Sequence, residues 1–306
     1  MSSAASGKTH VAEEMDRAET VLSGLIGKTI DTISIQSSDQ SEASFLAKNV
    51  SKLSPLVGNL VENLVVSELE QRLVDGNMEW RRQDPYFPDA ALFSQSGVAL
   101  GAGFEVKAWY AMSTEMTGRF RESRNLLEGK DIRLLVVSWG LSHIVFGKPV
   151  ILDVVSVPGV DVAECRDAHY HKPPNYLILE PEDTTGRASN LQQSNVNGYR
   201  LQGMASKEAV DVHSGSAARD EAPHTAKAQH LARKLHDLGR YRMDTNFAKI
   251  DRIDHEALEE FKERSLASRL RGRSMAEWSD CVQSLDSGSD TERVAATLAL
   301  SALYQE

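Results

Sequence analysis

The hydrophobic periodicity of this chain changes near residue 80, and that change constrains the fold more than any other feature. In the segment 56–73, apolar residues recur every three or four positions, among them Val57, Leu60 and Val61, which is typical of an amphipathic helix. From Trp80 to about residue 179 the apolar runs become short and rich in β-branched residues, bounded by Gly, Pro, Ser and Asn. This order predicts a mixed central β-sheet flanked by helices, an α/β (α+β) architecture.

The same patterns predict where the individual elements lie. Strands are expected at 98–110, 132–139, 143–146, 150–157 and 176–179. Helices are expected at 10–25, 41–53, 56–73, 114–127, 224–238, 255–271, 274–285 and 290–304. We group them into a helical N-terminal region at 1–54, a core at 55–203 and a helical C-terminal region at 204–306, which begins with a Ser-, Ala- and Gly-rich connection at 204–223.

Composition excludes several classes of protein. Hydrophobic residues make up 41% and charged residues 25% of the 306 positions, close to the averages of soluble globular proteins, so the chain is neither collagen-like nor wholly disordered. It has no uninterrupted apolar run of about 18 residues, and its start lacks the basic and apolar regions of a secretory signal. Cys165 and Cys281 have no metal-binding spacing. We expect a cytoplasmic protein with no membrane partner.

The net charge of −10 conceals an uneven distribution. Residues 1–80 hold 6 basic and 12 acidic side chains, and residues 243–306 hold 8 and 13, so the middle of the chain is close to neutral. Its most basic stretch is 224–242. A polyanion such as DNA would therefore bind the middle of the chain and not its ends, unless this stretch is only a solvated helix face.

The residues that carry chemistry lie in two neighbouring segments. Pro88-Asp89 is followed sixteen residues later by Glu105-Val106-Lys107, inside an apolar strand. Residues two apart on a strand share a face, so Glu105 and Lys107 are expected to point the same way, and a turn within 98–103 would return the chain and bring Asp89 beside them. Two carboxylates without Cys or His form an oxygen-only site, which suits Mg²⁺.

This arrangement resembles the PD-(D/E)xK nuclease superfamily, to which most type II restriction endonucleases belong. The resemblance implies a restriction-endonuclease-like sheet, Mg²⁺ held by Asp89 and Glu105, and Lys107 as the catalytic lysine. It further implies a helical glutamate ahead of the motif, for which Glu62 is the matching position. The resemblance covers about residues 55–180.

Alternatives remain open at each of these positions. Asp84, also followed by Pro, could replace Asp89, and Glu62 could be an ordinary surface residue of its helix. Glu105 and Lys107 could form an exposed ion pair of little energetic value.

A polar block at 180–203 has the chemistry to read DNA bases. Asn and Gln side chains pair with adenine and Arg with guanine in the major groove, although a loop of this composition could also be unpartnered. The helix expected at 114–127 would place arginines on phosphates. The DNA-binding candidates are Arg119, Arg124, Arg187, Asn190, Gln192, Gln193, Asn195, Asn197 and Arg200.

Together these features predict a Mg²⁺-dependent, site-specific double-stranded DNA endonuclease of a restriction system, a hydrolase that leaves 5′-phosphate and 3′-hydroxyl ends. A homodimer is expected, because two-fold protein symmetry matches a palindromic site. Two alternatives remain: a non-catalytic, sequence-specific DNA-binding or regulatory protein on the same scaffold, and a structure-specific repair or junction nuclease.

Overall fold

The computed structural model describes residues 2–37, 40–72, 74, 77–83, 86–168, 176–180, 198–201, 207–221, 225–238, 242–243 and 248–304. The chain divides into two compact units. The first comprises Met1–Met116, Arg133–Ser156 and Glu256–Glu306, and the second comprises Thr117–Ile132 and Val157–His255.

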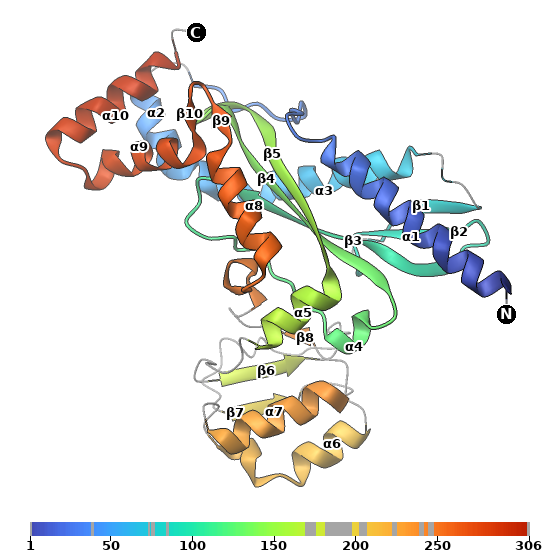
Figure 1. Ribbon diagram of the computed structural model, residues 1–306. Coiled ribbons are helices and arrows are strands. Elements are labelled where there is room, and N and C mark those ends of the chain that lie inside the picture. The colour runs from blue at the N-terminus through green and yellow to red at the C-terminus, as the bar shows by residue number, and fades with distance from the viewer. Residues whose placement is uncertain are drawn as a thin grey trace. The chain divides into compact units, whose positions relative to one another are not determined.

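The first unit contains the central sheet and most of the helices expected around it (Figure 1). Five strands in the order β1-β2-β3-β4-β5 form a curled, mixed sheet, which confirms the predicted architecture. The strands are β1 (Met78–Arg82), β2 (Ala90–Ser94), β3 (Ala99–Tyr110), β4 (Asp131–His143) and β5 (Phe146–Pro158). The helical elements of this unit are α1 (Ser2–Ser23), α2 (Gln40–Asn49), η1 (Val50–Leu53), α3 (Ser54–Glu70), α8 (Glu256–Ala267), α9 (Met275–Ser287) and α10 (Asp290–Ala302).

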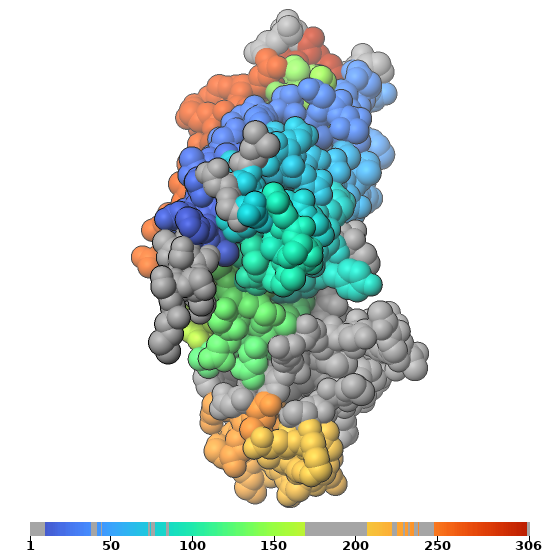
Figure 2. Space-filling model, turned by 90° about the vertical axis from the view of Figure 1, so that its right-hand side faces the viewer, coloured from blue at the N-terminus to red at the C-terminus, as the bar shows by residue number. Residues whose placement is uncertain are grey.

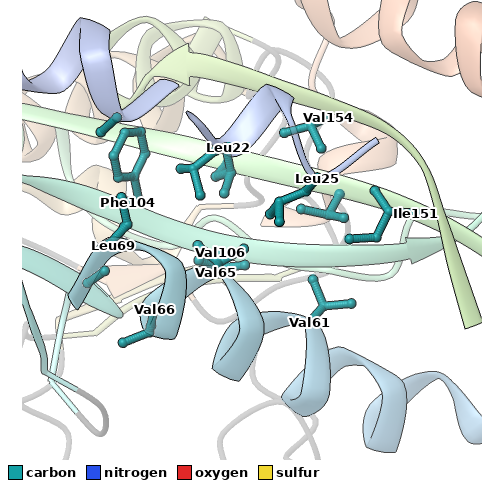
Figure 3. Close-up of a cluster of buried hydrophobic side chains, with 14 of the residues drawn as sticks. Leu22, Leu25, Val61, Val65, Val66, Leu69, Phe104, Val106, Ile151 and Val154 are labelled. Carbon is teal, nitrogen blue, oxygen red and sulfur yellow. The ribbon is translucent and has the colours of Figure 1, made fainter. Parts of the chain in front are cut away.

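The core lies where α1 and α3 meet the sheet (Figure 3). Val61 and Val65 of α3, Leu22 of α1, and Phe104 and Val106 of β3 belong to one cluster of buried apolar side chains. Pro55 occupies the first turn of α3, where its missing N–H costs no hydrogen bond. Because Phe104 and Val106 point into this cluster, the alternating residues of β3 point to the other face of the sheet.

The second unit is smaller and includes the short α4 (Arg124–Leu127) and α5 (Gly159–Ala168). A three-stranded sheet has the order β7-β6-β8, formed by β7 (Gly198–Leu201), β6 (Tyr176–Glu180) and β8 (Arg242–Met243). Its other helical elements are α6 (Lys207–Ser214), η4 (Ala217–Asp220), α7 (Ala226–Leu238) and η6 (Ile250–Arg252). The connection expected at 204–223 thus contains a helix and a turn of 3₁₀ helix.

The helix expected at 114–127 is wrong over most of its length, since only α4 forms. The backbone of the preceding residues pairs with another segment: Phe120 N donates to Ala248 O, and Ile250 N donates to Gly118 O. These long-range hydrogen bonds satisfy groups that a helix would have paired locally.

Two further element predictions are corrected. The strand expected at 143–146 is the turn between β4 and β5, in which Ile144 has a φ of 66°. The helix expected at 255–271 ends at Ala267, and a two-stranded hairpin of β9 (Arg269–Leu270) and β10 (Arg273–Ser274) follows it. No helix among the described residues is long and apolar enough to span a membrane.

Candidate active site

The pairing of β2 with β3 brings Asp89 beside the strand that carries Glu105 and Lys107. Ala90 pairs with Phe104 and Ala91 with Gly103 in an antiparallel ladder, so Asp89, one residue before Ala90, lies beside Glu105. Gly103 makes this close approach possible, because a Cβ atom there would lie 2.3 Å from the carbonyl oxygen of Ala90. The two motif segments therefore lie side by side, as predicted. The turn that returns the chain was expected within 98–103, but it precedes β3 and contains Gly97, which has a φ of 83°.

Three oxygen atoms surround the ammonium group of Lys107. Its Nζ atom donates hydrogen bonds to Glu105 Oε1 at 2.6 Å and to the carbonyl oxygen of Val106 at 2.8 Å. Asp89 Oδ2 lies 3.7 Å from the same nitrogen. The Lys107, Glu105 and Asp89 side chains are 22%, 16% and 13% exposed, so the cluster is half-buried but open to solvent on one side.

Asp89 is held in place by β3 itself. Its Oδ2 atom accepts a hydrogen bond of 2.7 Å from the backbone N–H of Val106. The carboxylate thus reaches across the ladder and satisfies a backbone donor between Glu105 and Lys107. A short, charge-assisted hydrogen bond of this kind fixes the orientation of the carboxylate.

Opposing effects determine the pKa of Lys107. Burial acts to lower the pKa of the ammonium, but attraction to Glu105 and Asp89, the hydrogen bond to Glu105 and the charge of Glu62 outweigh it, so the pKa lies above its ordinary value. The side chain therefore carries a positive charge at neutral pH. Two carboxylates face this one ammonium.

Glu62 lies near the cluster but pairs with a different cation. Its Oε1 atom is 3.6 Å from Nη1 of Arg82, and its side chain is 21% exposed. Arg82 ends β1 and also donates to Asn63 Oδ1 at 3.0 Å. The pattern of the sequence did not single out Arg82, because β1 was not predicted and the pair joins a helix to a strand.

The donor set suits a hard cation. Asp89, Glu105 and the Val106 carbonyl offer only oxygen atoms, and the Lys107 ammonium lies among them. Within the described part of the chain, no group of three or more His, Cys, Asp or Glu side chains lies close enough to hold a metal ion. A Mg²⁺ ion here would thus have two carboxylate ligands and complete its shell with water and substrate oxygens, a usual arrangement for this metal.

The DNA-binding candidates lie in the second unit or outside the described residues. Arg119 and Arg124 belong to the second unit, where Arg124 Nε forms an ion pair of 2.8 Å with Glu164. Arg200 lies on β7, but its side chain is not described. The remaining candidates and the rival Asp84 lie outside the described residues: Arg187, Asn190, Gln192, Gln193, Asn195 and Asn197.

The surface around the motif strands is visible in Figure 2, where the teal residues near 80–100 adjoin the light-blue residues of α3.

Comparisons with protein-family models, with curated proteins and with solved structures find no match to this chain. The similarity to PD-(D/E)xK nucleases therefore depends on the motif residues and their geometry alone.

Proposed function

We propose that this protein is a Mg²⁺-dependent endonuclease that hydrolyses phosphodiester bonds of double-stranded DNA. The observation that supports it best is the convergence of Asp89, Glu105 and Lys107, which are separated in sequence and meet where β2 and β3 pair. Each of these residue types in the PD-(D/E)xK arrangement has a role in phosphodiester hydrolysis.

The burial of the cluster favours a functional role over a surface ion pair. Holding two carboxylates and one ammonium at 13–22% exposure costs desolvation energy, which a single attraction offsets only in part. An ordinary structural pair would also need only one carboxylate. The second carboxylate gives a divalent cation two oxygen ligands in one place.

Each residue of the cluster would have its own role in the hydrolysis. Asp89 and Glu105 would hold Mg²⁺, which when bound lowers the pKa of a coordinated water and neutralises phosphate charge. Lys107 would donate a hydrogen bond that orients the attacking water and the scissile phosphate. The Val106 N–H would keep Asp89 in its binding orientation. As the family resemblance implies, the products would carry 5′-phosphate and 3′-hydroxyl ends.

The finer part of the proposal is cleavage at a defined sequence by a homodimer of a type II restriction system, with the 180–203 segment reading the bases. Two protomers related by a two-fold axis would each cut one strand of a palindromic site. The described cysteines, Cys165 and Cys281, form no disulfide, which supports a cytoplasmic site of action on intracellular DNA.

Digestion of a mapped plasmid tests the proposal. With Mg²⁺ the protein should give discrete fragments, and with EDTA it should give none. Lys107→Ala should retain DNA binding while cleavage falls by about 10²–10⁴-fold, the usual effect of losing a positioned proton-transfer group. Lys148→Ala is the matched control, because that lysine lies on β5 and forms an exposed ion pair with Asp31.

Three other results of this experiment would favour a different function or mechanism. Absence of cleavage by folded wild-type protein under all Mg²⁺ conditions, with DNA binding intact, would favour a non-catalytic DNA reader. A ladder of products instead of discrete fragments would favour a structure-specific nuclease. Unchanged cleavage by Lys107→Ala would remove this lysine from the mechanism.

A further inference from the structure

The β9–β10 hairpin carries three exposed arginines, Arg269, Arg271 and Arg273. Leu270 pairs with Arg273, and Arg269 pairs with Ser274, so only Arg271 and Gly272 form the turn. A two-residue turn gives the hairpin a fixed shape, and the three arginines lie within the segment 269–273.

Arg271 has an unusual backbone conformation for its residue type. Its φ is 48° and that of Gly272 is 81°, the pair of positive values found in hairpin turns that favour Asn-Gly. The Arg271 side chain reaches the end of β4, where Nε donates to Ser142 O at 3.1 Å and Nη2 lies 2.6 Å from His143 Nε2. An arginine at a position that a smaller residue would occupy with less strain suggests a functional reason.

The other two guanidinium groups contact a carbonyl oxygen and an aromatic ring. Arg269 Nη2 donates to the carbonyl oxygen of Gly272, and the Arg273 guanidinium lies 5.0 Å from the centre of the Trp278 ring. Within the described part of the chain, neither group has a carboxylate at ion-pair distance. Hydrogen bonds from Ser274 lower the pKa of the Glu277 carboxyl, and the charges of Arg269 and Arg273 lower it further.

The hairpin follows α8, which packs on the face of the sheet that carries Glu105 and Lys107. Glu105, Lys107 and Trp109 alternate with buried residues of β3 and share a face, and Trp109 packs against Phe261 of α8 with ring centres 6.1 Å apart. Farther along the chain, Ala111 belongs to the same small apolar cluster as Met275, with Leu270 of the hairpin packed against it. Ala111 follows Lys107 by four residues, which span about 13 Å in a strand. The apolar cluster that Leu270 contacts therefore begins about that far from Lys107.

We propose that this arginine hairpin binds the phosphate backbone of duplex DNA beside the site of cleavage. The inference rests on the proposed function and identifies a DNA contact outside the motif residues. Guanidinium groups match phosphate geometry, and rigid presentation reduces the entropy lost on binding. Duplex DNA carries a charge about every 1.7 Å along its axis, so a duplex cut at Lys107 would extend past the hairpin within a few base pairs.

The salt dependence of DNA binding tests this contact. We would measure binding of a duplex oligonucleotide to the full chain in EDTA at several salt concentrations, for wild type, Arg269→Gln/Arg273→Gln and the single variant Arg271→Asn. The double variant should bind at least about tenfold more weakly at low salt, and the slope of log affinity against log salt should decrease in magnitude by about 1–2. Arg271→Asn suits the turn and keeps the hairpin folded, and it should also reduce the slope.

A double variant with the same loss of charge provides the control. Arg293→Gln/Lys207→Gln removes two exposed cations, which pair with Asp290 and Asp211, and should bind DNA like the wild type. Equal slopes for the hairpin variants and the wild type would overturn the inference and leave the proposed function standing if the wild type still cleaves. If the hairpin variants and the control weaken binding equally, the effect is one of net charge and the contact is also overturned.

Discussion

The carboxylate of Asp89 accepts a hydrogen bond of 2.7 Å from the backbone N–H of Val106, which joins the segment before β2 to β3. The same oxygen faces the Lys107 ammonium at 3.7 Å. Asp89 therefore has a structural contact and an electrostatic one through a single atom, and substitutions can separate the two.

The first prediction concerns Asp89. Asp89→Asn keeps an oxygen that can accept from Val106 but removes the negative charge, so it should fold with nearly wild-type stability and lose Mg²⁺-dependent cleavage by at least about 10²-fold. Asp89→Ala also leaves the Val106 N–H without its partner and should lower the free energy of unfolding by about 1–3 kcal/mol. Urea denaturation and plasmid cleavage measure the two effects; equal stability of both variants would show that the hydrogen bond contributes little.

The second prediction concerns Glu62. The negative charge of Glu62 attracts the Lys107 ammonium and raises its pKa. Glu62→Gln should therefore weaken cleavage by about 10–100-fold, as for groups that support metal ligands. Glu68→Gln, on the same helix and paired with Lys28 at 2.8 Å, is the control and should cleave normally. Wild-type rates in Glu62→Gln would restrict the site to Asp89, Glu105 and Lys107.

The third prediction concerns Gly103. A Cβ atom there would lie 2.3 Å from Ala90 O and 2.8 Å from Pro88 Cγ, so Gly103→Ala must move β2, and Asp89 with it. We expect a loss of about 1–3 kcal/mol in stability together with reduced cleavage. Gly58→Ala in α3, where the nearest atom would be 3.9 Å away, should instead be neutral or stabilise by up to about 1 kcal/mol. Thermal unfolding of the two variants gives the comparison.

The fourth prediction concerns pH. The folded-state pKa of Lys107 lies above the ordinary value of 10.5, so the folded state binds this proton more tightly than the unfolded state. Its contribution to stability is therefore complete below pH 10.5 and is lost as pH rises through the folded-state pKa. The difference in unfolding free energy between wild type and Lys107→Met should stay constant from neutral pH to about 10 and shrink above it; a difference that grows with pH would contradict the charge assignment.

Local patterns predicted α3 well because its apolar residues and Pro55 act within one helix. They failed at 114–123, because the backbone there pairs with residues near 249, far along the chain. They also missed β1 and the β9–β10 hairpin, which are short and owe their hydrogen bonds to neighbouring strands.

The sequence by itself determined that Glu105 and Lys107 share a face, because alternation along a strand is a local property of the backbone. It also determined the helix before the motif and the mixed sheet that contains it. Only the tertiary structure decided that Asp89 lies beside them, that Glu62 pairs with Arg82, and that Arg271 reaches His143. Those distances depend on strand register and on the packing of distant segments, and no spacing within a single segment encodes them.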